Sequence, residues 1–344
     1  MRMLRCVVPP EFQGRDVNAI LREHLHLSHS HVRRAKFISG ALLLDGEPCW
    51  TVTKVQAGQE VAIAIDDGDV ASRETAMESQ EPPVGMLDVV YEDEDLLVIN
   101  KAPGLTMYPG PGHDRDTLGN YVMWYLRQQG RACSLHPVQR LDQGTSGLVV
   151  FATNAFAKER LQRQLHTANF CREYLAVCQG VPQPSQGIID APWARLSSHP
   201  NTFGVAEDGK RAVTHYQVLA SWHVGEGTEG QTCLSEGAEG IRVEACGEDV
   251  PCGGERVVHR SLVQLRLETG RTHQIRIHMA HVGHPLVGDA TYGTPSPDIS
   301  RPALHSWRLS LTHPVTGRRV ELTADMPVDL LTLLDQEACA SIGA

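Results

Sequence analysis

One short stretch of the chain combines side chains that could do chemistry with a turn. Residues 140–147 read RLDQGTSG, and residues 148–151 read LVVF, an apolar run typical of a buried strand. An aspartate beside glycines usually accepts hydrogen bonds from nearby backbone amides and does nothing more. That role leaves Arg140 and the hydroxyl groups of Thr145 and Ser146 unexplained. The stretch is therefore a candidate functional site around Asp142.

A second stretch, ETGRTHQIRIH at residues 268–278, places basic side chains at the start of an expected helix. Thr272 is expected to cap this helix, so that His273 and Arg276 lie three residues apart on one helical face. An arginine that reaches a carboxylate favours its ionised form, which a nucleophile or a base requires.

The histidines of this region offer a second interpretation, a zinc site. His278 and His281 could share a helical face, with His273 and His284 nearby in the sequence. The helix is mostly aliphatic, however, and no carboxylate or thiol ligands accompany these histidines. We therefore expect no metal here.

The composition is that of a soluble globular protein with room for two domains. Hydrophobic residues make up 41% of the 344 residues, and no apolar run approaches the roughly 20 residues of a membrane-spanning helix. The apolar stretch before Pro9-Pro10 is too short for a secretory signal. The nine cysteines are an odd number without a CxxC pair, which suits a reducing compartment. We expect a cytoplasmic protein with no membrane partner, and we expect it to be a monomer.

The net charge of −10 argues at first against a nucleic-acid partner, but the charge is unevenly distributed. Residues 66–95 have a balance of −10 and residues 223–257 a balance of −6, which leaves +6 for the remainder. Two acidic segments, expected to be solvated loops, thus mask a mildly basic body.

The first structural unit is expected at residues 13–65. The apolar spacing predicts two short helices, the second capped by Ser28 or Ser30 and ended by Gly40. Short strands follow, with a hairpin turn at Asp45-Gly46.

This unit resembles the alpha-L RNA-binding domain, first known from a ribosomal protein of the small subunit. The second helix carries three basic residues, Arg33, Arg34 and Lys36. By themselves they favour a solvated helix face. The resemblance implies that they bind RNA.

The rest of the chain divides into a linker and a larger domain. Residues 66–85 are acidic and contain Pro82-Pro83, as expected of a linker. In residues 86–338 strand patterns outnumber helix patterns and often follow each other directly, which predicts an α+β fold with a mixed, largely antiparallel sheet. Helices are expected at residues 117–129, at 154–169 with Asn154 as the cap, and at 327–338.

Residues 223–257 interrupt two expected strands of this domain. They are rich in Gly and Glu, so we expect a long mobile insertion that contributes little to the core. The spacing of Cys233, Cys246 and Cys252 matches no common zinc pattern.

Four motifs, in one order, resemble those of the RluA-type pseudouridine synthases. They are YEDEDLLVINKAPGL at 91–105, RLDQGTSGL at 140–148, REYLA at 172–176 and ETGRTHQIRIH at 268–278. The segments at 283–289 and 304–305 also fit, so the resemblance spans about residues 87–338. The chain departs from the pattern at Gln139, where the family usually has histidine; either side chain can bond a neighbour.

The resemblance implies an enzyme that isomerises uridine in ribosomal or transfer RNA to pseudouridine. Asp142 would act as nucleophile or base, Tyr174 would stack on the uracil, and Arg276 would be the basic partner of Asp142. The target uridine would be flipped into the pocket. The residues expected to bind the RNA substrate in this domain are Arg140, Thr145, Arg271, His273 and Gln274. The reaction needs no electrons, phosphates or activated groups, so we expect no cofactor.

Two other classes of protein remain as alternatives. A catalytically silent RNA-binding protein could keep the fold, although the intact Asp142, Tyr174 and Arg276 argue against it. A retaining glycosidase would need two carboxylates, and no second carboxylate accompanies these motifs.

Overall fold

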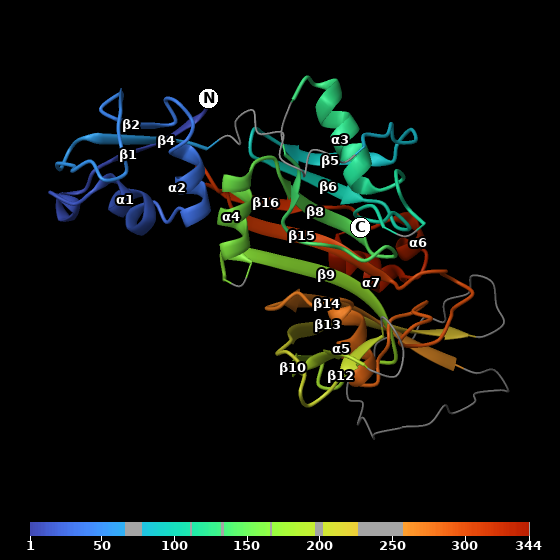
Figure 1. The fold of residues 1–344 in the computed structure, drawn as a ribbon. Helices are drawn as coiled ribbons and strands as arrows, with labels where there is room; N and C mark the ends of the chain where they lie inside the picture. The colour runs from blue at the N-terminus through green and yellow to red at the C-terminus, as the bar shows by residue number, and fades with distance from the viewer. Residues whose placement is uncertain are drawn as a thin grey trace.

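The computed structural model describes residues 1–65, 78–110, 112–131, 134–165, 167–196, 202–225 and 257–343. The chain forms a small N-terminal domain and a larger domain built on a long twisted sheet (Figure 1). The small domain has an antiparallel sheet of order β1-β4-β2-β3. Its strands are β1 (Met3–Val7), β2 (Leu42–Leu44), β3 (Glu47–Pro48) and β4 (Glu60–Ala64). Its helical segments are η1 (Pro10–Phe12), α1 (Val17–Ala19), the π-helical continuation η2 (Ile20–His24), and α2 (His29–Ala35).

Most of the local expectations for the small domain are confirmed. The Ser28 hydroxyl caps α2 by accepting a hydrogen bond from the His31 amide at 3.1 Å. Asp45 and Gly46 form the hairpin turn with φ of 51° and 85°. The start of the domain differs from the expectation. The domain begins at Met3 and not at residue 13, because β1 pairs with β4 along its whole length.

The expected end of α2 at Gly40 is wrong. The helix ends at Ala35, and the amides of Phe37 and Ile38 then bond to carbonyls three residues back. This tighter winding finishes the helix before Gly40, which lies in a later turn with φ of 72°.

The large domain contains a mixed sheet of order β10-β13-β14-β9-β15-β8-β6-β5, with β16 beside β15 and β7 beside β8. Among the described strand pairs, β8 and β15 are the one parallel pair of this sheet, which confirms the α+β, largely antiparallel expectation. The strands of this sheet are β5 (Leu87–Glu92), β6 (Leu96–Lys101), β7 (His136–Pro137), β8 (Ser146–Ala152), β9 (Phe170–Gln179), β10 (Gln186–Asp190), β13 (Val213–Gly225), β14 (Val257–Leu267), β15 (Leu304–Thr312) and β16 (Arg319–Thr323). A separate ribbon pairs β11 (Trp193–Arg195) with β12 (Phe203–Val205).

Helices cover both faces of the sheet. They are α3 (Leu118–Gln128), α4 (Ala155–Gln164), α5 (Gln274–His281), α6 (Val328–Leu331) and α7 (Gln336–Ile342). Because side chains alternate along a strand, β6 and β8 supply apolar residues to both faces. Those that pack with α3 are Leu97, Ile99, Val149 and Phe151. Those that pack with α4 are Leu96, Val98, Leu148 and Val150. Among the described residues, no helix has the length and apolar character needed to cross a bilayer.

The helix expected at residues 327–338 is instead two short helices. The side chain of Asp335 accepts a hydrogen bond from the Ala338 amide and starts α7 as a new helix after α6. A capping aspartate inside a helical pattern thus separates the two segments. The cap expected for α4 is confirmed, since Asn154 accepts a bond from the Ala157 amide at 2.7 Å.

The strands β8 and β15 approach each other closely at one point. Their parallel pairing covers only two residue pairs, one of which joins Gly147 to Ser306. Gly147 has φ of 105°, and a Cβ atom there would lie 2.2 Å from the Ser306 carbonyl oxygen. Only glycine satisfies both the backbone conformation and the spacing.

The small domain packs against α4 of the large domain (Figure 1). Phe156 of α4 is only 2% exposed and belongs to the apolar cluster of the small domain. The Arg160 guanidinium lies over the Phe156 ring and donates to the Leu25 carbonyl at 2.7 Å. Arg2 pairs with Asp95 across the same contact. The two domains therefore share apolar and charged contacts.

The two acidic segments lie partly outside the described residues. Residues 66–77 of the linker lie outside the described residues. Residues 226–256 of the insertion, with Cys233, Cys246 and Cys252, also lie outside them. The rest of the linker is bound to α3, since the Asn120 side chain donates to the Glu78 carbonyl at 2.7 Å. Residues 223–225 and Val257 were expected in the insertion, but they belong to β13 and β14.

Replacing residues 226–256 with a short turn should preserve both folding and activity. Gly225 and Val257 are partners in the β13–β14 ladder, so a connection of about two to five residues can join them. We expect the melting temperature to stay close to that of the wild type, as measured by differential scanning calorimetry. A loss of cooperative unfolding would show that residues 226–256 are part of the folded core.

Candidate active site

The carboxylate of Asp142 lies in a tight turn that enters β8. The amide of Thr145 donates to the Asp142 carbonyl at 3.0 Å and closes the turn. Leu141 and Thr145 on either side are buried, whereas the Asp142 side chain is 28% exposed. The turn thus leaves the Asp142 carboxylate partly open to solvent, between two residues that anchor the turn in the core.

Two buried cations hold this turn in place. The Lys101 ammonium donates to the carbonyls of Ala102 and Leu105, each at 2.9 Å, and to the Gln143 carbonyl at 3.1 Å. Arg301 donates to the Gly144 carbonyl at 3.0 Å. Burial and the charge of Arg301 lower the pKa of Lys101 to about 7, against the opposing effect of Asp142. The sequence motifs predict neither role, although Lys101 lies within the motif at residues 91–105.

The start of α5 brings two nitrogen groups close to Asp142, one of them from Arg276, its expected partner. Nε2 of His273 and Nη1 of Arg276 each lie 3.9 Å from an Asp142 oxygen. The expected cap at Thr272 is wrong: His273 itself occupies the cap position, with φ of 56° and no capping bond from its side chain. This left-handed conformation is unusual for a residue other than glycine.

The short ionic partner of Arg276 is Asp289, which sequence reasoning did not assign. Nε and Nη2 of Arg276 donate to the two Asp289 oxygens at 2.7 Å each, and Asp289 is fully buried. This bidentate pair leaves Nη1 as the nitrogen that faces Asp142. Burial opposes the charge of both partners, but their contact outweighs it, so the pKa of Arg276 is raised and that of Asp289 is lowered. Asp289 thereby orients Arg276.

Tyr174 lies in β9, on the face that packs with α5. Burial raises the pKa of its phenol; the charge of Arg172 opposes this shift and the charge of Asp142 adds to it. The phenol is therefore protonated at neutral pH and lies within the electrostatic reach of Asp142.

The other expected substrate residues have different environments. Arg140, two residues before Asp142, and Arg271, three residues before α5, are exposed. Thr145 is buried. The amide group of Gln274 is fully used within the protein. It donates to Val213 and Thr214 and accepts from Thr269 and from the Arg271 amide at 3.0 Å. The family resemblance predicts that Gln274 binds RNA; its bonds instead fix the loop before α5.

Gln139 has no hydrogen-bond partner for either side-chain amide atom among the described residues, although the residue is buried. The expectation that it bonds a neighbour in place of the usual histidine is therefore wrong. A glutamine carries its donor and its acceptor on one carbon, whereas a histidine carries its two nitrogens on opposite sides of a ring, so the two side chains do not reach the same partners.

Three of the four histidines considered for zinc have hydrogen-bond partners within the protein. His278 is buried and contacts the Thr214 hydroxyl at 2.9 Å and the Ala191 carbonyl at 3.1 Å. Nδ1 of His284 lies 3.0 Å from the Gln179 carbonyl, and Nδ1 of His273 lies 3.0 Å from the Tyr292 hydroxyl. These three histidines therefore point to separate partners.

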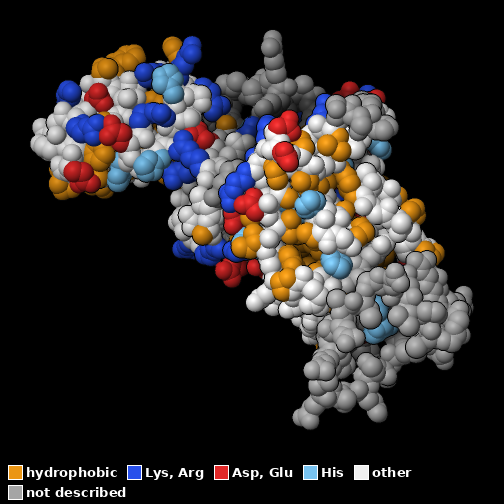
Figure 2. Space-filling view, turned by 90° about the horizontal axis from the view of Figure 1, so that it is seen from below, with side chains coloured by type: hydrophobic (Ala, Val, Ile, Leu, Met, Phe, Trp, Pro, Cys, Tyr) orange, Lys and Arg blue, Asp and Glu red, His pale blue; other side chains and the backbone are white. Residues whose placement is uncertain are grey.

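The basic residues of α2 are not part of this constellation. Arg33, Arg34 and Lys36 are exposed on the small domain, which lies on the other side of α4 (Figure 1). Figure 2 shows Lys and Arg side chains gathered on the small domain and along its junction with the large domain. This distribution agrees with the positive charge of the residues outside the two acidic segments, although the net charge of the chain is negative.

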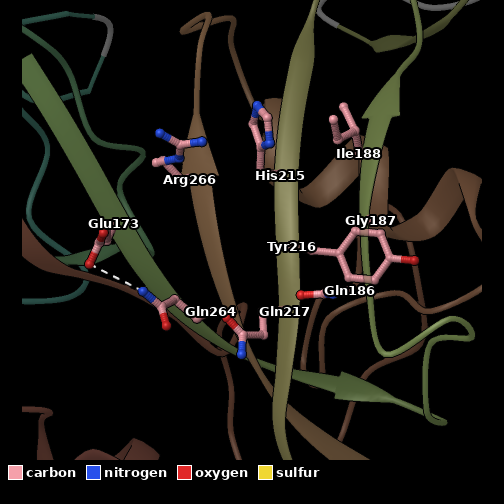
Figure 3. Close-up of a pocket in the computed structure, with 9 residues that line it drawn as sticks. All are labelled: Glu173, Gln186, Gly187, Ile188, His215, Tyr216, Gln217, Gln264 and Arg266. Atoms are coloured by element: carbon pink, nitrogen blue, oxygen red, sulfur yellow. Dashed lines mark hydrogen bonds between the residues drawn. The ribbon is translucent and has the colours of Figure 1, made fainter. Parts of the chain in front are cut away.

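A polar hollow on the sheet is distinct from the Asp142 site. It is lined by residues of β9, β10, β13 and β14, among them Glu173, His215 and Gln264 (Figure 3). Glu173 neighbours Tyr174 in the strand and so points to the opposite face of the sheet. The hollow therefore lies behind the strand that carries Tyr174.

The comparisons with known proteins agree with this arrangement. Residues 95–281 match the model of the RNA pseudouridylate synthase family. The ribosomal large subunit pseudouridine synthase D of Haemophilus influenzae is 32% identical over 348 residues, which cover 96% of this chain and 94% of the relative. An uncharacterized RNA pseudouridine synthase of Bacillus subtilis is 35% identical over 81% of this chain and 79% of its own. The solved structure of human RNA pseudouridylate synthase domain containing 1 is 26% identical, with a TM-score of 0.50 over 72% of this chain and 87% of that chain. The family match and these relatives together lead to one conclusion: the chain belongs to the RNA pseudouridylate synthase family.

Proposed function

We propose that this enzyme isomerises uridine in ribosomal RNA of the large subunit, with Asp142 as the nucleophile or base. The observation that carries the assignment of Asp142 is its surroundings: both of its oxygens face nitrogen groups of α5 at 3.9 Å. That distance exceeds a hydrogen bond, so the oxygens of Asp142 stay available to a reactant. The Arg276 charge stabilises the carboxylate by Coulomb attraction without occupying it.

The reaction breaks the bond between ribose C1′ and uracil N1, turns the base, and joins C1′ to C5. Asp142 either attacks a carbon of the nucleotide or removes a proton from it, and the carboxylate is regenerated at the end; C5 loses the proton that N1 gains, so the product is an isomer of the substrate. Tyr174 offers a buried aromatic face on which the flipped uracil can stack. Its raised pKa keeps a proton on the phenol, which can serve in proton transfer.

Large-subunit ribosomal RNA is supported as the substrate by the relative in Haemophilus influenzae, which aligns along nearly its whole length. The exposed basic residues of α2 supply a surface for RNA outside the pocket. Transfer RNA is the alternative. Incubation of the enzyme with each RNA, followed by nucleoside analysis, separates the two, and pseudouridine found only in transfer RNA would refute the ribosomal assignment.

Asp142→Asn should abolish pseudouridine formation and leave the melting temperature and the RNA affinity near those of the wild type. The amide keeps the size of the side chain but lacks its charge and nucleophilicity. Within the described residues the Asp142 side chain loses no short bond, because the nitrogen groups that face it are 3.9 Å away. Asp208→Asn, at an exposed turn, is the matched control. Turnover of Asp142→Asn within a few-fold of the wild type would refute the role of Asp142.

Arg276→Ala should lower kcat by about a hundredfold or more and change KM much less. This variant also leaves the buried Asp289 without a partner, which is strongly destabilising. The double variant Arg276→Gln/Asp289→Asn removes both charges and separates the two effects. We expect it to fold and to remain slow. If it folds and turns over at the wild-type rate, the charge of Arg276 has no part in catalysis.

Replacing Arg33, Arg34 and Lys36 with Gln should weaken RNA binding and spare the single-turnover rate of bound RNA. Each lost phosphate contact should lower the slope of log affinity against log salt by about 0.7 to 0.9. These substitutions are a cleaner test than deletion of residues 1–65, because deletion would expose Phe156 and remove Arg2, an ion-pair partner of Asp95. Arg5→Gln, on β1, is the control for charge alone. An unchanged affinity and salt slope in the triple variant would contradict an RNA-binding role of α2.

A further inference from the structure

One buried arginine of the large domain differs from the others in its partners. Arg172 is 5% exposed, and its Nε and Nη2 atoms have no hydrogen-bond partner within the described part of the chain. By contrast, Arg276 and Arg301 are each paired bidentately with an aspartate, at distances of 2.7 to 2.8 Å. Burying a guanidinium without such a partner is costly. The fold therefore buries a guanidinium that forms no ion pair with the described carboxylates.

The acidic neighbour of Arg172 cannot neutralise this charge. Glu173 points to the opposite face of β9, where its carboxylate accepts a hydrogen bond from Gln264 at 3.2 Å (Figure 3). The residues that flank Arg172 on its own face of the strand are Phe170 and Tyr174. The guanidinium lies 6.0 Å from the ring centroid of Phe170, a contact that supplies little compensation for a lost water shell.

The position of Arg172 links it to the reaction site. Tyr174 follows two residues later on the same face of β9. Nη1 of Arg172 lies so close to Gly270 that a Cβ atom there would be only 2.8 Å from it. Gly270 belongs to the loop that leads into His273, whose Nε2 faces Asp142 at 3.9 Å. The cation is thus enclosed between the tyrosine and the loop of the Asp142 site.

We propose that Arg172 is a substrate-binding residue whose guanidinium receives an oxygen of the target nucleotide that carries negative charge. Two oxygens of the RNA have this chemistry. One belongs to a phosphate that flanks the flipped uridine; the other is a uracil carbonyl oxygen, which gains charge when the C1′–N1 bond breaks and its electron pair stays on the base. Either oxygen would accept hydrogen bonds from the guanidinium nitrogens of Arg172 that have no partner among the described residues of the free enzyme. This inference rests on the proposed function, because it assigns part of the substrate to the same site.

The test compares Arg172→Met and Arg172→Lys with the wild type in the full-length protein. Melting temperature, RNA affinity and single-turnover rate are measured for each. Arg266→Met is the matched control, since Arg266 is the β14 ladder partner of Glu173, is exposed, and lies on the opposite face. Turnover by the wild type tests the proposed function, and the variants test Arg172, so the two can fail separately.

We expect Arg172→Met to raise the melting temperature by about 2 °C or more, because it removes an unpartnered buried charge. It should also reduce affinity or rate by about ten- to a hundredfold, the effect of a charge-assisted hydrogen bond. Arg172→Lys should recover only part of this loss, because an ammonium lacks the planar fork. A residue with a structural role alone would instead lose stability and activity together, and that result would overturn the proposal. Wild-type affinity and rate in Arg172→Met would also overturn it.

RNA with an uncharged methylphosphonate beside the target uridine identifies which oxygen binds. If the phosphate is the partner, this RNA binds the wild type more weakly, and Arg172→Met has no further effect on it. If the uracil oxygen is the partner, affinity is unchanged and the rate loss in Arg172→Met is the same on both RNAs. An Arg172→Met loss no greater than that of Arg266→Met on either RNA would refute both.

Discussion

The hydrogen bonds from Lys101 to three backbone carbonyls are the interaction on which the rest of the site depends. A buried ammonium is costly unless its donors are satisfied, and here three carbonyl oxygens from two turns satisfy them. Lys101 ends β6, and the carbonyl of Gln143 follows Asp142 directly, so this side chain joins the end of one central strand to the start of another. Arg301 adds a bond to the adjacent Gly144 carbonyl from the segment before β15. The position of the Asp142 carboxylate is therefore set by three neighbouring strands.

The cationic side of the site is fixed by a separate set of contacts. Asp289 occupies two nitrogens of Arg276 and directs the third toward Asp142. Gln274 anchors the loop before α5 to β13, and His273 holds a left-handed backbone at the start of the helix. Asp142 and Arg276 are thus each held by partners of their own, so that neither needs the other as a hydrogen-bond partner. This arrangement leaves the carboxylate free for a substrate while a positive charge remains nearby.

Sequence reasoning was most successful where the signal is local. The hairpin turn at Asp45-Gly46 and the caps Ser28 and Asn154 depend on residues a few positions apart. The ordered motifs also predicted that Asp142 and α5 meet, as the distances confirm. What remained hidden depends on partners that are distant in the sequence.

These hidden features share one physical cause. The pairing of β1 with β4, the role of Asp289, and the saturated amide of Gln274 are all set by tertiary contacts. The cap of α5 at His273 overrides the local preference for Thr272. The lack of partners for Gln139 is likewise a property of its buried surroundings, which no residue type reveals.

Gly147 has a consequence for how relatives of this enzyme can diverge. Glycine is required at position 147 by the backbone conformation and by the approach of Ser306. Neither requirement concerns the reaction. The opposite holds for Asp142, whose side chain makes no short contact with the described part of the chain. A descendant that gave up isomerisation and kept the fold would be free to lose the aspartate and bound to retain the glycine. Within residues 140–147, selection for the fold and selection for the reaction therefore act on different residues.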